Sequence, residues 1–245
     1  MTEEFETEKP RHRLLSFVRR GGRLTTAQER AMRDLAPEYI VDVERGDGVT
    51  SVAAGHTLDL AALFGRTAPV TVEIGSGQGH QITHAAASHP ERDFLALEVF
   101  TGGLARTMVL AEQQNVHNLR LIEANAPEVL EHLLPAESID EIWIFFPDPW
   151  HKARHNKRRL ISDPFMPILA RVLRPGGLVR LATDWEDYAL QMRDVFDAAP
   201  QFSREFSGEW APRFDGRLLT AFEQKGIKAG REIRDLVFRR ENVTN

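Results

Sequence analysis

Short apolar runs alternate with helical patterns through most of the chain. Five of these runs are typical of strands: Val70–Ile74, Phe94–Val99, Leu119–Glu123, Ile139–Phe145 and Leu178–Thr183. Between them, helical periodicity occurs near Gln81–Ser88, Leu104–Gln114, Pro127–Leu134 and Pro164–Leu173. Several runs are continuously apolar, as strands must be when both faces of a parallel sheet are covered. The pattern therefore predicts a doubly wound α/β domain.

The last quarter of the chain predicts further elements. After Asp184 we expect one helix, a strand at Phe202–Phe206 and a final strand at Leu236–Arg239. The sequence Arg-Pro-Gly-Gly at Arg174–Gly177 predicts a turn that ends one helix and starts the next strand. Proline cannot continue a helix, and glycine accepts the left-handed conformation.

The N-terminal region changes the sign of its charge. Residues 1–8 hold four glutamates and almost nothing apolar, which predicts a mobile tail. Residues 9–23 carry six cations and no acid, and they suit either an amphipathic segment packed on the domain or a nucleic-acid contact. Thr25 or Thr26 followed by Glu29 predicts a helix start with a capping box. We therefore separate a partly flexible region, 1–55, from a domain at 56–245.

Composition narrows the chemistry. The 245 residues carry a net charge of −5, so binding to a polyanion requires a local basic surface. The absence of cysteine excludes disulfides, thiolate nucleophiles and Cys-based metal sites, and we expect a cytoplasmic protein. The sequence has no apolar run of about 18 residues, so no membrane span is expected.

The first predicted strand leads into a glycine-rich turn, Glu73-Ile74-Gly75-Ser76-Gly77-Gln78-Gly79. Such a turn brings backbone close to a ligand, and the helix that follows offers free N–H groups. Its third glycine comes two residues after the second, whereas the dinucleotide fingerprint needs three, and an acid lies two residues before the first glycine. The turn therefore predicts a nucleotide-like cofactor other than NAD, with a simple tight turn as the alternative.

Polar residues follow the next two strands at the same expected edge of the sheet. Glu98 ends the second strand, where a carboxylate can accept hydrogen bonds from both hydroxyls of a ribose. We expect it to be exposed, so that its removal leaves the fold intact. Asn125 and Ala126 follow the third strand, where a turn or helix-cap role is the alternative.

The fourth strand ends in Phe145-Phe146-Pro147-Asp148-Pro149-Trp150. The two prolines stiffen the loop and hold the Asp148 carboxylate at the edge of the sheet. The cations that follow, with no acid among them, are Lys152, Arg154, Lys157, Arg158 and Arg159. This combination predicts a nucleobase presented to the carboxylate while phosphates are held alongside.

A metal site and a hydrolase site are both disfavoured. His151 and His155 have the spacing of helical metal ligands, but Lys152 occupies the place of the catalytic glutamate and nearby cations oppose a metal ion. The serine nucleophile motif fails because Ser76 is second, not third, in its glycine-rich turn.

These motifs together resemble the bacterial tRNA (guanine-N7-)-methyltransferase family. The resemblance spans residues 11–240 and rests on Glu73–Gly79, Glu98, Pro147–Trp150 with its His-Lys-x-Arg-His continuation, Asp184 and Thr220–Glu223. It implies a Rossmann-like class I methyltransferase fold with a mostly parallel sheet and a C-terminal antiparallel strand. It also implies transfer of a methyl group from S-adenosyl-L-methionine to N7 of the guanine at position 46 in the tRNA variable loop.

The resemblance implies roles for individual residues. Cofactor contacts would come from Glu73, Gly75, Gly77, Glu98, Asn125, Ala126 and Asp148, with Asp148 also catalytic. Substrate contacts would come from Lys152, Asp184, Thr220, Ala221, Phe222 and Glu223. Contacts to RNA would come from Arg154, His155, Asn156, Lys157, Arg158 and Arg159.

Three positions depart from the family pattern. Asn125 replaces the usual aspartate, Ala153 the usual lysine and Ala221 a polar or basic residue. Asparagine keeps an acceptor and adds a donor, while the alanines remove a possible cation and a polar side chain from the RNA side.

The implied chemistry agrees with the residues available. Guanine N7 has a lone pair, so methyl transfer needs alignment rather than a strong base, and Asp148 suits a base, a stabiliser or a cofactor anchor. Asp184 or Glu223 can accept from guanine N1–H and N2–H₂. Trp150 or Phe222 would either stack on the base or pack in the core.

Two other functions and the oligomeric state stay open at this point. A nicotinamide-dependent oxidoreductase would use the same sheet, although the glycine spacing disfavours it. A non-catalytic RNA-binding protein would use only the basic segments. The sequence does not distinguish a monomer from a homodimer.

Overall fold

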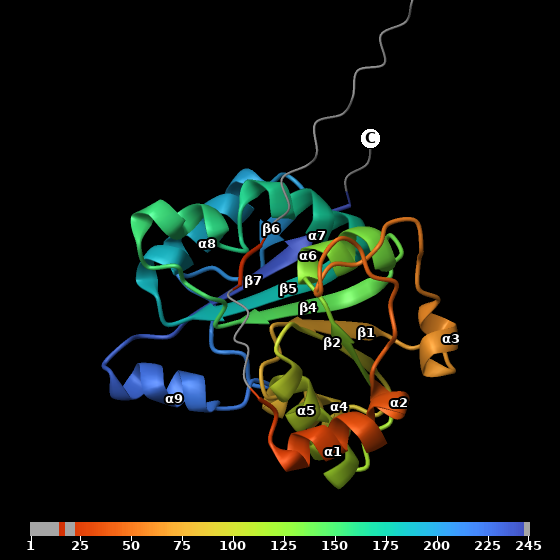
Figure 1. The fold of residues 1–245 in the computed structure, drawn as a ribbon. Coiled ribbons are helices and arrows are strands. Elements are labelled where there is room, and N and C mark those ends of the chain that lie inside the picture. Colours follow the sequence, from red (N-terminus) through yellow and green to blue (C-terminus); the bar gives the residue numbers. More distant parts are fainter. Residues whose placement is uncertain (1–14, 18–22, 243–245) are drawn as a thin grey trace, which may run out of the picture.

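The computed structural model describes residues 15–17 and 23–242, and these form one α/β layered structure (Figure 1). Its sheet has the order β3-β2-β1-β4-β5-β7-β6. The strands are β1 (Val70–Ile74), β2 (Asp93–Glu98), β3 (Leu119–Glu123), β4 (Ile139–Phe145), β5 (Leu173–Thr183), β6 (Phe202–Arg204) and β7 (Arg234–Arg240). Strands β1 to β5 are parallel, whereas β7 is antiparallel to β5 and β6. The predicted doubly wound, mostly parallel sheet with antiparallel C-terminal pairing is confirmed.

Helices cover both faces of this sheet (Figure 1). One layer holds α1 (Thr26–Asp34), α2 (Ala36–Tyr39), α4 (His80–Ser88) and α5 (Thr101–Gln113). The other holds α6 (Ala126–Glu128), α7 (Met166–Val172) and α8 (Glu186–Ala198), while α3 (Leu60–Phe64) and α9 (Ala221–Lys228) lie to the sides. Each layer packs on its own apolar cluster, so alternate residues of β2 enter different cores: Leu95 on one face and Phe94 on the other. Burial on both faces explains the continuous apolar runs.

Two local predictions need correction. The predicted helix at Pro127–Leu134 is α6 followed by one π-helical turn, Val129–Leu133. Arg174–Gly177 does not precede a strand but lies within β5, where the β4 pairing shifts between Ile139–Leu173 and Glu141–Leu178. Gly176 has a φ of +81°, so glycine permits this bulge.

The described part of the N-terminal region shares the core of the domain. Val41 and Val52 belong to the same apolar cluster as β1 and β4, and the Val41 N–H donates to Leu121 O over 2.9 Å. Helix α1 begins with a capping box between Thr25 and Gln28, one residue before the predicted partner Glu29. The predicted acidic tail and most of the basic segment lie outside the described residues.

Candidate active site

The predicted site residues gather where the order of strands reverses. Strand β1 lies between β2 and β4, so the connections leave this point in opposite directions. Open α/β sheets bind ligands in this crevice, at the carboxyl ends of their strands. Glu73, Glu98, Asn125 and Asp148 lie at or directly after the ends of β1, β2, β3 and β4 in that order. The topology therefore brings together residues that are up to 75 positions apart in the sequence.

The glycine-rich turn is closely packed against α5. Gly75 and Gly77 have φ values of +74° and +59°, which glycine adopts without strain. A Cβ atom at Gly79 would lie 2.1 Å from Thr107 Oγ1, and one at Gly103 would lie 2.1 Å from Gly77 O. Both the backbone angles and the close helix therefore require glycines, and the turn delivers the chain to the start of α4.

Glu98 holds this turn in place. Its Oε2 accepts from Gly77 N–H at 2.7 Å, and its Oε1 accepts from Val99 and Phe100 N–H groups at 2.7 and 3.0 Å. The side chain is 9% exposed, and its burial raises its pKa against the lowering effect of those hydrogen bonds. The expectation of an exposed carboxylate without a role in the fold is wrong, because the side chain turns back to bind free N–H groups. A carboxylate has about four lone-pair sites, so a ribose hydroxyl still finds an acceptor.

Glu73 is a buried acid at the centre of the site. Burial, followed by the negative charge of Glu98, raises the pKa of Glu73 to about 8. Its Oε2 has no hydrogen-bond partner among the described residues. A buried acceptor in this state fits a ligand that brings an N–H donor, such as the ammonium group of S-adenosylmethionine.

Asn125 is fixed by Glu128 behind it. The Asn125 amide nitrogen donates to Glu128 Oε1 at 2.8 Å, while Glu128 Oε2 accepts from Ser51 Oγ and Val52 N–H. Asn125 N–H also donates to Thr50 O at 2.7 Å. The asparagine thus supplies a donor to a buried carboxylate, which an aspartate would not do. Ala126 follows as the first residue of α6.

Asp148 is exposed on a strained loop. Phe146 and Trp150, on either side of it, have φ values of +52° and +46°. Each such non-glycine conformation costs about 1–3 kcal/mol and persists only when its surroundings enforce it. Phe146 N–H donates to Ala182 O, and the Trp150 indole N–H donates to Ser16 O at 2.9 Å. Burial is the main cause of the raised pKa of Glu98, and the negative charge of Asp148 adds to it, so the two carboxylates lie near each other.

The basic run divides into a surface part and one buried cation. None of the residues of the 3₁₀ helix Ala153–Arg158 is buried: Arg154, Lys157 and Arg158 are exposed, as is Lys152 before them, while His155 and Asn156 are half-buried. Arg158 lies over the Trp150 ring with its Cζ 4.9 Å from the centroid. These positions leave the predicted RNA contacts open to a partner.

The burial of Arg159 contradicts the predicted RNA contact of this residue. It is 1% exposed and donates to Pro149 O at 2.9 Å, to Gln191 Oε1 at 2.7 Å and to Asp187 Oδ2 at 2.5 Å. Its guanidinium also lies over the Tyr188 ring. The run turns inward at this residue, and an acid on α8 compensates the buried charge. Arg159 therefore holds the Asp148 loop and does not reach RNA.

The predicted substrate residues of the C-terminal part have different exposures. Thr220 caps α9 and accepts from Glu223 N–H at 3.3 Å. Phe222 is 69% exposed, while the side chain of Ala221 lies outside the described residues. Asp184 is partly exposed, and its Oδ2 accepts from Arg231 Nε at 2.7 Å.

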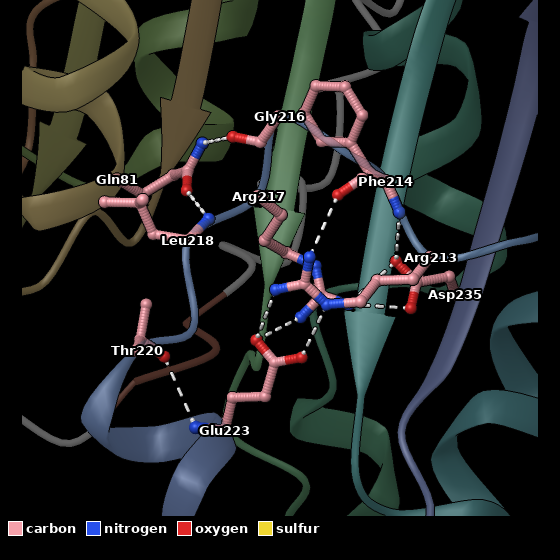
Figure 2. A network of polar contacts seen from close by, with 9 residues as sticks. All are labelled: Gln81, Arg213, Phe214, Gly216, Arg217, Leu218, Thr220, Glu223 and Asp235. Carbon is pink, nitrogen blue, oxygen red and sulfur yellow. Dashed lines mark hydrogen bonds and ion pairs between the residues drawn. The ribbon is translucent and has the colours of Figure 1, made fainter.

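Glu223 does not face solvent as a guanine acceptor would. It is 1% exposed and is turned toward Arg213 and Arg217 (Figure 2). Sequence reasoning missed Arg217, along with Gln81 and Glu128. Glu128 lies three residues after Asn125 and can be found by helical spacing, whereas Arg217 and Gln81 belong to no local pattern.

Neither a metal site nor a membrane span is formed by the described residues. Over the ranges 15–17 and 23–242, no three histidine or acidic side chains converge as metal ligands would. Among the helices in these ranges, none is long and apolar enough to cross a membrane.

Comparisons with known proteins identify the family. Residues 67–236 match a family described as "Putative methyltransferase". The tRNA (guanine-N(7)-)-methyltransferase of Cutibacterium acnes is 47% identical over 235 residues, which cover 95% of this chain and 85% of that protein. The enzyme of the same name from Aeromonas hydrophila subsp. hydrophila is 42% identical, with 97% and 96% covered.

Solved structures support the fold. The antibiotic-resistance methyltransferase Kmr has a TM-score of 0.53 at 18% identity, covering 82% of this chain and 99% of Kmr. A 16S rRNA (adenine(1408)-N(1))-methyltransferase from Catenulisporales acidiphilia, solved with SAM, has a TM-score of 0.53 at 16% identity, covering 80% and 96%. The Rossmann-like class I methyltransferase fold is confirmed. Together with the close relatives, these findings show that the chain belongs to the tRNA (guanine-N(7)-)-methyltransferase family.

Proposed function

We propose that this protein transfers the methyl group of S-adenosyl-L-methionine to N7 of the guanine at position 46 in the variable loop of tRNA. The observation that carries the proposal is the convergence of Glu73, Glu98 and Asp148 at one sheet edge, with the exposed cations of Ala153–Arg158 following Asp148 directly. Family membership supports the reaction, and the names of the relatives support tRNA and guanine N7. The proposed location is the cytoplasm.

The acids at the sheet edge fit the parts of S-adenosylmethionine. Glu73 Oε2 would accept from its ammonium group, and Glu98 from a ribose hydroxyl. Asn125 and Ala126 lie at the end of the neighbouring strand, beside the ribose-binding acid. When bound, the cofactor supplies an electrophilic methyl group on a positively charged sulfur.

Asp148 is proposed to act through its charge. Guanine N7 carries an available lone pair, so no side chain has to remove a proton before attack. Positive charge reaches the guanine as the methyl group is transferred, and a preorganised carboxylate nearby stabilises it. The strained, proline-bracketed loop keeps Asp148 at this point.

Recognition of the tRNA is proposed to involve three surfaces. Asp184 is the partly exposed acid that would accept from guanine N1–H and N2–H₂, a donor pair that adenine lacks. Phe222 is the exposed aromatic that would stack on the base once it leaves the helical stack. Lys152, Arg154, Lys157 and Arg158 would hold phosphates.

The experiment is methylation of unmodified tRNA by the purified protein, with the product mapped by N7-specific cleavage and mass spectrometry. We expect one 7-methylguanine at position 46 and none in a transcript with adenine there. Methylation at another nucleotide would contradict the position, and a protein that binds tRNA without methylating it would contradict the reaction. Calorimetry with S-adenosylmethionine and with NAD tests the oxidoreductase alternative. Binding of NAD instead of S-adenosylmethionine would favour an oxidoreductase.

A further inference from the structure

A single glutamine connects the cofactor side of the molecule to its C-terminal loop. Gln81 lies in the first turn of α4, two residues after Gly79, and is 3% exposed. Its Nε2 donates to Gly216 O at 2.9 Å, and its Oε1 accepts from Leu218 N–H at 2.7 Å (Figure 2). These two hydrogen bonds hold the backbone on both sides of Arg217. The loop is therefore fixed to α4, the helix that follows the glycine-rich turn.

From this position the Arg217 side chain contacts three elements. It is 2% exposed, and its Nη1 lies 2.6 Å from Glu223 Oε2 on α9. Its Nη2 donates to both carboxylate oxygens of Asp235 on β7, at 3.0 and 2.7 Å. Its guanidinium carbon lies 5.4 Å from the ring centroid of Phe146, two residues before Asp148. One planar cation thus contacts the helix of the predicted substrate residues, the sheet and the start of the Asp148 loop.

Helix α9 depends on this polar contact because none of its described apolar side chains is buried. Among the α9 side chains that the structure describes, Phe222 and Ile227 are 69% and 51% exposed. Only Glu223 and Gly226 are buried there, and Gly226 lies directly against Asp184. Figure 1 shows α9 to one side of the two helix layers. Its position is therefore set by the ion pairs of Glu223 with the buried Arg217 and the more exposed Arg213, and by close contact at Gly226.

We propose that Arg217 is a positioning residue that holds α9, and with it Thr220 and Phe222, beside the Asp148 loop and the cofactor turn. In this arrangement Glu223 anchors the helix instead of binding guanine. This inference rests on the proposed function, which assigns Thr220 and Phe222 to substrate binding. Arginine is required because its planar fork contacts Glu223 and Asp235 together, which the point charge of lysine does not do.

The test compares Arg217→Lys with Arg213→Lys. Arg213 contacts the same Glu223 carboxylate at 3.2 Å, but its side chain is 42% exposed, which makes it a matched control. We expect Arg217→Lys to lower kcat for tRNA methylation at least tenfold per cofactor-binding site. The Kd for S-adenosylmethionine should change less than threefold, because its proposed contacts lie at the strand ends. The Kd for tRNA should also change less than threefold, because the proposed phosphate contacts of Lys152, Arg154, Lys157 and Arg158 lie outside α9. Arg213→Lys should stay within twofold of wild type in all three.

A merely structural role would lower the number of cofactor-binding sites and leave kcat per site unchanged, and this result would overturn the proposal. If Arg217→Lys binds no cofactor, Gln81→Met decides instead, since it frees the loop while keeping every charge paired. Reduced kcat with retained tRNA binding supports the proposal, and unchanged kcat overturns it.

Hydrogen exchange gives a readout that does not depend on methylation. In Arg217→Lys, or in Gln81→Met if that variant replaces it, amides of α9 should exchange at least tenfold faster while those of α4 and α5 keep their protection. Equal α9 protection in variant and wild type would overturn the proposal. An inactive wild-type protein would instead contradict the proposed function and leave this comparison valid.

Discussion

At the scale of single residues, Asn125 shows how a departure from a family pattern is accommodated. Its amide donates to the buried Glu128 carboxylate, which also accepts from the Ser51 hydroxyl and the Val52 N–H. The asparagine therefore matches a local partner, because its amide donates to the acid three residues later.

From the contact between Asn125 and Glu128 we predict the effect of placing the usual aspartate at position 125. Asn125→Asp places a second carboxylate against Glu128 and removes a donor, which should destabilise the fold by about 1–3 kcal/mol. Adding Glu128→Gln restores a donor between the two side chains and should recover most of that loss. Chemical unfolding at pH 7 measures the free energy of unfolding of both variants. If Asn125→Asp alone is as stable as wild type, the contact is not required.

Asp148 predicts a loss of turnover without a loss of cofactor. Asp148→Asn keeps the shape and removes the charge, so kcat should fall by about 10²–10³ while the Kd for S-adenosylmethionine changes little. Asp163→Asn makes the same change at an exposed residue that begins the 3₁₀ helix Asp163–Phe165, and it should leave kcat unaltered. Single-turnover methylation compares the two, and equal rates would remove Asp148 from the centre.

At the scale of elements, the strands were predictable because burial on two faces leaves a continuous apolar run. Val70–Ile74, Leu119–Glu123 and Ile139–Phe145 have the same bounds as β1, β3 and β4. The start of β5 was not predictable in this way. Its bulge arises from pairing with β4, and the sequence of Arg174–Gly177 alone reads as a simple turn.

The site was predictable where its residues follow strands, and not where they meet across long loops. Glu73 and Glu98 lie at strand ends, so topology alone places them together. Gln81 and Leu218 are separated by 137 positions, and no periodicity reports their contact. Arg159 was misassigned because burial inside a basic run depends on Asp187 of a later helix.

The 3₁₀ helix Ala153–Arg158 predicts a salt-dependent interaction. Each phosphate contact contributes roughly 0.7–0.9 to the slope of log affinity against log salt. The double variant Arg154→Ala/Lys157→Ala should lower the slope for tRNA binding by about 1–2, with little effect on cofactor binding. Arg204→Ala/Arg239→Ala removes two cations at the opposite end of the sheet, where Arg239 pairs with Leu178. An equal slope in both double variants would show that the basic helix does not contact RNA.

At the scale of the whole molecule, the burial of Glu73 makes stability depend on pH. The acid lies in the sheet between the two apolar cores, and its pKa is about 8 in the folded protein against 4.5 in a free side chain. The folded state therefore binds more protons between these values. The contribution of Glu73 to stability therefore falls as pH rises from about 4.5 to about 8, by about 1.4 kcal/mol per unit.

Glu73→Gln should remove this dependence. We expect the unfolding free energy of the cofactor-free wild type to decrease between pH 6 and pH 8 relative to the variant, which stays neutral. At pH 8 the variant should be the more stable protein, although it binds S-adenosylmethionine more weakly. Urea unfolding at several pH values measures this, and parallel pH profiles would show that Glu73 is charged throughout.

The inward turn of Arg159 has a consequence for sequence variation. Under the proposed function, Arg154 and Lys157 need only a positive charge near RNA, so we expect arginine and lysine to replace each other there. At Arg159, three directed N–H groups meet Pro149, Gln191 and Asp187 at once, and an ammonium does not reproduce that geometry. We therefore expect members of one basic run to be under different selection, Arg154 and Lys157 for charge and Arg159 for shape.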